Sequence, residues 1–117
     1  MDTVTAVPPL CRLDEIPDGG ATAVELPRPV DGSEPDSLIL LRRGDLVTAY
    51  RNICPHAGRR LDYAPGKFLL KGGTLICAVH GASFARDDGL CVAGPCRGEH
   101  LHAVAVRVAD GMVWSAS

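Results

Sequence analysis

The clearest hydrophobic pattern in the chain is a pair of apolar runs that a two-residue turn separates. Residues 37–43 (SLILLRR) and 46–52 (LVTAYRN) flank Gly44-Asp45. Glycine at the first of two turn positions suits a tight hairpin, because the backbone there takes a positive φ angle that matches the twist of the strands. The sequence therefore predicts an antiparallel β-hairpin across residues 37–52.

A second hairpin is predicted near the C-terminus. Residues 103–108 (AVAVRV) place valine at every second position and alanine or arginine between, which is the period of a half-buried strand. Asp110-Gly111 then provides a turn into residues 112–115 (MVWS). The alternation places the three valines on one face of the strand and Ala103, Ala105 and Arg107 on the other.

The rest of the chain adds a strand and a long irregular stretch. Residues 21–26 (ATAVEL) predict a strand, and residues 27–37, rich in Pro, Asp, Gly and Ser, predict a loop. From Cys54 to Gly98 the chain is rich in Gly and Pro and shows no helical period. We expect one domain over residues 1–117, an all-β antiparallel sandwich with a loop-rich inserted subdomain at about 52–98.

Composition agrees with this class and excludes several functions. At 117 residues and 46% hydrophobic content, the chain has the size and core of one globular domain. The net charge is −2 and no basic run is present, so we expect no nucleic-acid partner. The sequence has no basic, apolar leader and no apolar window of membrane-spanning length, so we expect no membrane and a cytoplasmic location.

The cysteines indicate metal binding rather than a disulfide framework. They are five, an odd number, and nothing suggests export: Cys11, Cys54, Cys77, Cys91 and Cys96. Two of them are closely followed by histidine and then by a small residue, in NICPHAG (52–58) and ICAVHGASF (76–84). Two thiolates and two imidazoles can therefore converge from two loop tips.

Three interpretations of these Cys-His pairs compete. The four residues could be ordinary loop residues, although two such pairs are hard to ascribe to coincidence. They could hold a structural zinc ion, which accepts two cysteines and two histidines in a tetrahedron. Zinc fingers, however, usually pair cysteine with cysteine and histidine with histidine, whereas each loop here contributes one of each. A Rieske-type [2Fe-2S] centre has two cysteines on one iron and two histidines on the other, which this arrangement matches.

The chain resembles the Rieske proteins in the motifs CPHAG and CAVHGASF. The resemblance implies a Rieske-type β-sandwich and one [2Fe-2S] cluster, with Cys54 and Cys77 on one iron and His56 and His80 on the other, solvent-edge iron. DGLCVAGP (88–95) resembles the proline-bearing third loop that covers the cluster in this family. The gap from His56 to Cys77 is a few residues longer than is common in the family, so the resemblance gives the ligands but not the shape of the loop around residues 64–73.

Chain length narrows the function that the resemblance implies. A Rieske oxygenase would need a catalytic domain with a two-histidine, one-carboxylate iron site, and only His100 and His102 remain for it. A respiratory Rieske protein would carry a disulfide between its cluster loops, where this chain has Arg59 and Val79. We expect His100 and His102 to be exposed polar residues at the start of a strand rather than a second metal site.

The second motif also predicts a low reduction potential. High-potential relatives carry a serine and a tyrosine whose hydroxyls stabilise the reduced cluster, and these positions are Ala82 and Phe84 here. We therefore expect the low end of the Rieske range, about −150 mV. Ser83 lies between them, and its contribution stays open.

The predicted function is one-electron transfer without catalysis. The resemblance implies a carrier, expected to be a monomer, that takes electrons from a flavin-dependent reductase and passes them to a terminal oxygenase. The alternative is a Rieske small subunit of an NAD(P)H nitrite reductase-like enzyme, partnered by its large subunit. Residues 54–100 carry a net charge of +2 and residues 1–53 carry −4, so the predicted cluster end is mildly positive. Cys91 and Cys96 bracket the third loop and could form a disulfide beside the cluster, but in a reducing cytoplasm we expect two thiols.

Overall fold

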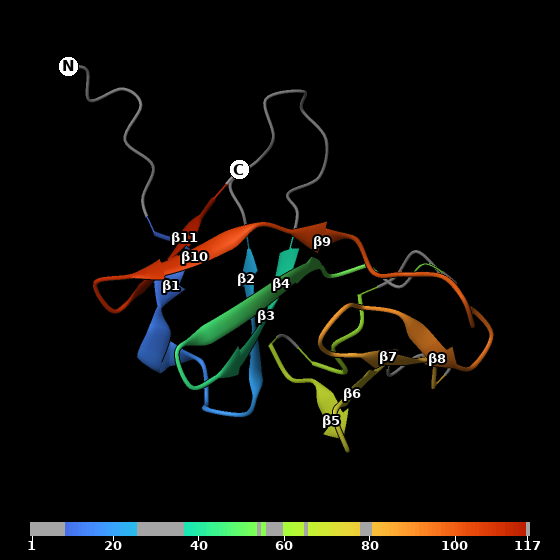
Figure 1. Ribbon diagram of the computed structural model, residues 1–117. Coiled ribbons are helices and arrows are strands. Elements are labelled where there is room, and N and C mark those ends of the chain that lie inside the picture. Colours follow the sequence, from blue (N-terminus) through green and yellow to red (C-terminus); the bar gives the residue numbers. More distant parts are fainter. Residues whose placement is uncertain are drawn as a thin grey trace.

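The computed structural model describes residues 9–25, 37–53, 55, 60–64, 66–77 and 81–116 of the chain. Apart from one 3-10 turn at Leu13–Glu15, the regular structure of these residues is antiparallel β-sheet, which forms three sheets (Figure 1). Within the same residues, no helix is long and apolar enough to cross a membrane. The predicted all-β class is confirmed.

Across the described residues the three sheets contain eleven strands. The first sheet has the order β1-β11-β10, with β1 Cys11–Arg12, β10 Val106–Ala109 and β11 Met112–Ser115. The second has the order β2-β3-β4-β9, with β2 Ala21–Glu25, β3 Ser37–Arg43, β4 Leu46–Arg51 and β9 Ala103–Val104. The third has the order β5-β6-β7-β8, with β5 Leu69–Lys71, β6 Thr74–Ile76, β7 Ser83–Ala85 and β8 Cys91–Ala93.

The predicted hairpin at residues 37–52 is confirmed as β3 and β4. Gly44 takes a φ of 63°, and Arg43 pairs with Leu46 across the turn. The run of five buried residues in β3, Ser37–Leu41, does not alternate, because both faces of this strand are covered. Leu38 and Leu40 belong to the core under the first sheet, and Ile39 and Leu41 belong to a second core that includes β6, β7 and β8.

The turn of the second predicted hairpin is confirmed, but the prediction of one continuous strand over residues 103–108 is wrong. Asp110 and Gly111 both take positive φ angles, 56° and 72°, and β10 pairs with β11 across them. The predicted strand at 103–108 is two strands, however, because the chain leaves one sheet at Ala105 and joins another. β9 pairs with β4, whereas β10 pairs with β11. The valines still share one partly buried face, as the alternation predicted.

The predicted strand at residues 21–26 is confirmed over Ala21–Glu25 as β2, which pairs with β3. Of the loop predicted at 27–37, Ser37 belongs to β3 and the other positions lie outside the described residues.

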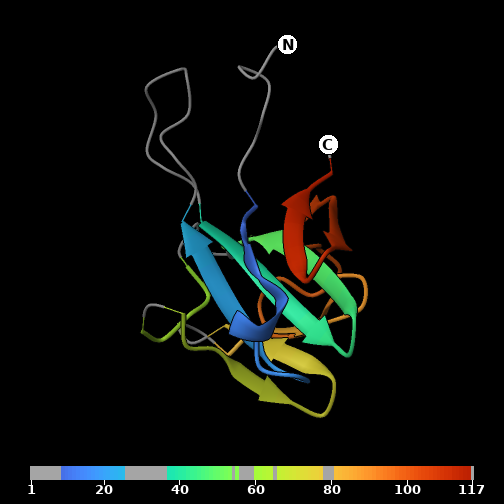
Figure 2. The same ribbon diagram turned by 90° about the vertical axis from the view of Figure 1, so that its left-hand side faces the viewer.

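The middle of the chain folds as a small sheet whose strands are too short to show a period in the sequence. β5 to β8 contain three residues each. The longer connection between the two motifs makes a tight turn, in which the Tyr63 N–H donates to the Lys67 carbonyl at 3.0 Å, and then the β5–β6 hairpin. This hairpin projects at the edge of the molecule opposite β10 and β11 (Figure 2).

Tyr50 joins this small sheet to the sandwich. Its side chain is 1% exposed, and its hydroxyl donates to the Arg86 carbonyl at 2.9 Å, just after β7. Burial, with the nearby Asp88 and Asp87 carboxylates, raises the pKa of Tyr50 to about 12, so the hydroxyl keeps its proton and remains a donor. A Cβ atom on Gly89 would lie 2.8 Å from the Tyr50 ring, so only glycine fits against it.

Candidate metal centre

The structure describes one of the four predicted ligands. Cys77 directly follows β6, is 1% exposed and belongs to the core of the small sheet. Cys54, His56 and His80 lie outside the described residues. Within the part of the chain that the structure describes, no three His, Cys, Asp or Glu side chains lie close enough together to hold a metal ion. The structure therefore defines this centre through Cys77 and the bases of the two motif loops.

The base of the second loop is closed by the backbone of Cys77. Its N–H donates to the Ala82 carbonyl at 2.7 Å, and its own carbonyl accepts from the Gly81 N–H at 3.0 Å. Gly81 takes a φ of 75°, which a residue with a side chain adopts only at a cost. These bonds fix the points at which the segment containing His80 leaves the sheet and returns to it.

The base of the first loop is closed by the side chain of Asn52, which is 1% exposed. Its Oδ1 accepts the Leu61 N–H at 2.8 Å, on the far side of the segment that contains Cys54 and His56. Its Nδ2 donates to the Ser37 Oγ at 3.3 Å. The amide thus ties both ends of the first loop to β3 and satisfies a buried backbone donor.

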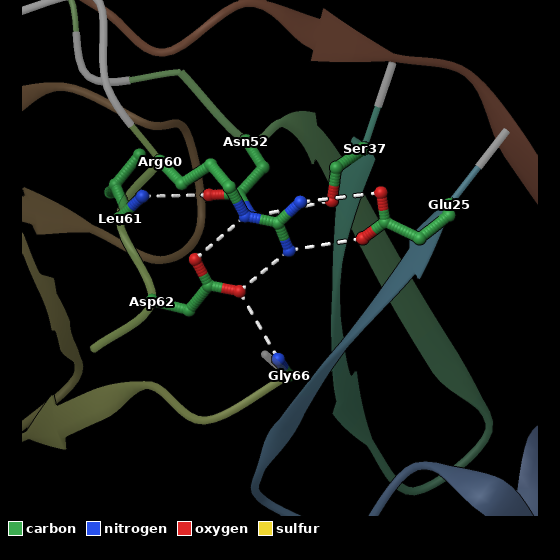
Figure 3. A network of polar contacts seen from close by, with 7 residues as sticks. All are labelled: Glu25, Ser37, Asn52, Arg60, Leu61, Asp62 and Gly66. Carbon is green, nitrogen blue, oxygen red and sulfur yellow. Dashed lines mark hydrogen bonds and ion pairs between the residues drawn. The ribbon is translucent and has the colours of Figure 1, made fainter. Parts of the chain in front are cut away.

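An ion-pair network continues from this base to the sandwich (Figure 3). The Arg60 guanidinium binds both carboxylate oxygens of Asp62, at 3.0 Å and 2.8 Å, and also binds Glu25 on β2. Asp62 Oδ2 in addition accepts the Gly66 N–H at 3.1 Å. Since the Asp62 side chain is only 3% exposed and that of Glu25 is 59% exposed, Asp62 is the member that solvent screens least.

Asp62 is held in its charged form by this network. Burial alone would raise its pKa, but the hydrogen bonds from Arg60 and Gly66 outweigh burial and hold the pKa of Asp62 below its usual range. The Arg60 side chain bonds Asp62 through two nitrogens, a bidentate geometry that fixes the direction of both side chains. The return segment of the first loop is therefore anchored by charge as well as by the Asn52 amide.

A third loop packs on the second. Its ends are joined by Cys91, whose N–H donates to the Glu99 carbonyl at 2.7 Å and whose carbonyl accepts the Gly98 N–H at 3.0 Å. Gly94 lies between them with a φ of 100°, and a Cβ atom there would fall 2.7 Å from the Ala82 Cα. The backbone at Gly94 therefore lies directly against the end of the loop that follows Cys77.

The side chains next to the second loop offer few hydrogen bonds. Ala82 and Phe84 are fully buried and carry no hydroxyl. Ser83 points to the other side of β7, and its Oγ donates to the Gly81 carbonyl at 3.4 Å. The hydroxyl that the sequence left open is thus engaged by the backbone.

His100 and His102 are both exposed, as expected, and neither belongs to a strand. His100 forms an isolated bridge with Leu90, and the His102 carbonyl accepts the Arg51 N–H at 2.8 Å. Their surroundings are those of polar surface residues.

Comparison with known protein families identifies the family of this chain. The model of the Rieske [2Fe-2S] domain matches residues 6–109. The chain belongs to the Rieske [2Fe-2S] family. No curated protein sequence matches the chain closely enough to add to this assignment.

Solved Rieske structures have the same fold. The ferredoxin of carbazole 1,9a-dioxygenase from Nocardioides aromaticivorans IC177 is 30% identical, with a TM-score of 0.70 over 93% of this chain and 95% of that one. A chain from the complex of reduced oxygenase and oxidized ferredoxin in carbazole 1,9a-dioxygenase is 28% identical, with a TM-score of 0.70 over 93% and 91%. The terminal oxygenase from Novosphingobium sp. KA1 shares the fold alone, at 22% identity and a TM-score of 0.73, and the match covers 94% of this chain and 30% of the oxygenase.

The described residues fit the [2Fe-2S] cluster that a Rieske domain carries. The Cys77 thiol lies in an apolar core at the base of the second loop, a position that suits a thiolate ligand of the inner iron. When bound, the cluster would accept and release one electron, which is the chemistry of an electron carrier.

Two features of the site were not predicted from the sequence: the Asn52 clamp and the ion pairs of Arg60, Asp62 and Glu25. The sequence could have indicated the role of Asn52, because a polar residue that follows an apolar strand and precedes a loop is a candidate for a buried cap. It gave no indication of the ion pairs, since Glu25 and Arg60 are 35 residues apart.

Proposed function

We propose that this Rieske protein is a one-electron carrier that takes electrons from a flavin-dependent reductase and passes them to a terminal oxygenase. The observation that supports it most is the similarity to the ferredoxin of carbazole 1,9a-dioxygenase, which extends over 93% of this chain and 95% of that ferredoxin. A ferredoxin of such a system forms a complex with its oxygenase. By contrast, the chain spans only about a third of the terminal oxygenases that it matches.

We assign Cys54 and Cys77 to one iron of the cluster and His56 and His80 to the other. The mixed Cys-His spacing supports this set, as does the burial of Cys77 at the base of its loop. In this assignment Asn52 and the Cys77 backbone hold the ends of the two ligand loops at fixed separations. Ala82 and Phe84 keep water away from one side and supply no hydroxyl donor, which supports a potential at the low end of the Rieske range.

The whole chain would act as one Rieske domain, residues 1–117, with the cluster held by about 52–98. We further propose that it works as a cytoplasmic monomer. The net positive charge of residues 54–100 would favour approach of an acidic surface on the redox partner.

The test uses the purified holoprotein with NADH and a flavin-dependent ferredoxin reductase, first with cytochrome c as acceptor and then with a terminal oxygenase of the carbazole 1,9a-dioxygenase type. We expect cytochrome c reduction, and then oxygenase turnover, to depend on this chain and to be lost in Cys77→Ser. A chain that aggregates alone, or transfers no electrons until the large subunit of an NAD(P)H nitrite reductase is added, would overturn the carrier proposal in favour of the subunit.

A further inference from the structure

Two cysteines outside the proposed ligand set face each other in the third loop. The Sγ atoms of Cys91 and Cys96 are 3.0 Å apart, and both residues are 1% exposed. A disulfide has an S–S bond of about 2.0 Å, so these sulfurs would need to approach by about 1 Å to bond.

The backbone holds the two cysteines in this position. Cys91 is bonded to both Gly98 and Glu99, and the Glu99 N–H donates to the Cys96 carbonyl at 2.9 Å. The two ends of the loop are therefore already together, so closing the ring between the sulfurs orders little additional chain. The pair is preorganised by the fold and does not depend on a chance encounter.

The position of the pair links it to the metal centre. Gly94 lies inside the Cys91–Cys96 ring and is the residue whose backbone packs on Ala82. Both thiols share the buried core of Cys77 and Phe84. Among the described residues, no third histidine, cysteine or carboxylate lies close enough to form a metal site with them. The reaction that remains for this pair is oxidation of the two thiols.

We propose that Cys91 and Cys96 form a reversible intramolecular disulfide that closes the third loop covalently over the second ligand loop. The oxidant is a low-molecular-weight disulfide of the glutathione class. One cysteine thiolate attacks the external disulfide, which forms a mixed disulfide and releases one glutathione thiolate. The other cysteine then attacks the protein sulfur of that mixed disulfide and releases the second glutathione. Two electrons pass from the pair to the oxidant, and the two thiol protons end on the two glutathiones.

The disulfide would change how firmly the third loop is held. In the dithiol form only noncovalent contacts hold Gly94 against Ala82, and both thiols react only when the loop opens, because neither is exposed. In the disulfide form the six-residue ring from Cys91 to Cys96 cannot open in this way. This expectation rests on the proposed ligand set: in the presence of a chelator, the disulfide form should lose its cluster several-fold more slowly than the dithiol form.

The first experiment does not depend on the cluster assignment. The holoprotein is equilibrated without oxygen in buffers of reduced and oxidised glutathione, alkylated, digested and analysed by mass spectrometry. We expect the Cys91 and Cys96 thiols to disappear together in a two-electron transition, to yield a Cys91–Cys96 crosslinked peptide, and to return with dithiothreitol. The crosslink should be absent in Cys91→Ser and in Cys96→Ser and should remain in the control Cys11→Ser. Full alkylation of both thiols at every glutathione ratio, or a crosslink to a different cysteine, would overturn the proposal.

The second experiment measures cluster loss, followed by visible absorbance in excess chelator, for the oxidised and reduced forms. We expect the oxidised wild type to bleach several-fold more slowly than the reduced form, and Cys96→Ser to bleach at one rate in both buffers. Equal rates for the two wild-type forms, with the crosslink present, would overturn the proposed action on the second loop. A coloured protein that forms the crosslink but carries no electrons would refute the proposed function and leave the disulfide standing.

Discussion

Gly94 and Ala82 lie so close that a Cβ atom on Gly94 would fall 2.7 Å from the Cα of Ala82. The two residues belong to different loops, one after β8 and one after Cys77. Their contact is therefore where the third loop meets the end of the loop that follows Cys77. Real Cβ atoms do not approach a backbone this closely, so any larger residue at position 94 must push the two loops apart.

Gly94→Ala should therefore weaken cluster retention and lower the free energy of unfolding. The positive φ costs about 1–3 kcal/mol, and the collision with Ala82 adds a further penalty of similar size. Gly98→Ala is the matched control, because Gly98 lies in the same loop with a φ of 95° and nothing within 4 Å of its Cβ position. Urea unfolding and the chelator bleaching rate should both rank Gly94→Ala as the more damaging change. Equal losses for the two variants would show that the loops do not press on each other.

Asn52→Ala should damage the base of the first loop. It removes the acceptor of the Leu61 N–H, and an unsatisfied buried donor costs about 1–3 kcal/mol. The measurement is the free energy of unfolding together with iron content per chain, and we expect both to fall. Ser37→Ala, which removes the acceptor of the Asn52 Nδ2 and the hydroxyl that hydrogen-bonds the exposed Glu25 carboxylate, should cost about 1 kcal/mol and leave the iron content unchanged. If Ser37→Ala lowered the free energy of unfolding more than Asn52→Ala, the hydrogen bond from the Leu61 N–H would not be the one that stabilises the base of the first loop.

Asp62→Asn should destabilise the protein by about 1–3 kcal/mol near pH 7, where the charged, Arg60-bonded carboxylate contributes most. The pKa of Asp62 is lower in the folded chain than in the unfolded one. Its contribution is therefore complete above the unfolded pKa of about 3.9 and is lost as the pH falls through the lower folded value. The difference between wild type and variant in urea unfolding should accordingly shrink below about pH 4.

The control for this prediction is Glu25→Gln, which removes the exposed carboxylate of the same network. Because solvent screens Glu25, we expect a loss of no more than about 1 kcal/mol. A wild-type advantage over Asp62→Asn that stayed constant from pH 7 to pH 3 would argue against a charge effect.

Phe84→Tyr and Ala82→Ser should each raise the reduction potential. One new hydrogen bond that stabilises the reduced state by about 1 kcal/mol corresponds to roughly 43 mV for a one-electron couple. Protein-film voltammetry measures this directly. Ser83→Ala is the control, since the Ser83 hydroxyl already donates to the Gly81 carbonyl and should leave the potential within about 10 mV of wild type. A downward shift in Phe84→Tyr would mean that solvent exposure or charge, not the missing hydroxyls, keeps the potential low.

The sequence predicted the elements whose patterns are local. Gly44 and the Asp110-Gly111 pair identified both hairpin turns, because positive φ angles favour very few residue types. The two Cys-His motifs identified the family for a similar reason, since the ligand chemistry requires particular residues at short spacing.

The features that the sequence did not predict mostly depend on contacts between distant residues. Residues 103–108 alternate as one strand would. The alternation does not show that the residues before Ala105 pair with β4 and the residues after it pair with β11. The strands β5 to β8 are three residues long, which is too short for a period of two to stand out. The sequence indicated Cys91 and Cys96 as a possible pair, but the 3.0 Å distance between their sulfurs depends on the turn between them, which the sequence does not fix.

The most direct test of the central claim is spectroscopy of the holoprotein, purified without oxygen and reduced by one electron. We predict two irons and two acid-labile sulfides per chain, a paramagnetic reduced cluster, and nitrogen couplings from two histidine ligands in pulsed electron paramagnetic resonance. Cys77→Ser should abolish all three, while Cys91→Ser should keep them. One zinc ion per chain without sulfide, or a reduced cluster without nitrogen couplings, would contradict the assignment of Cys54, His56, Cys77 and His80.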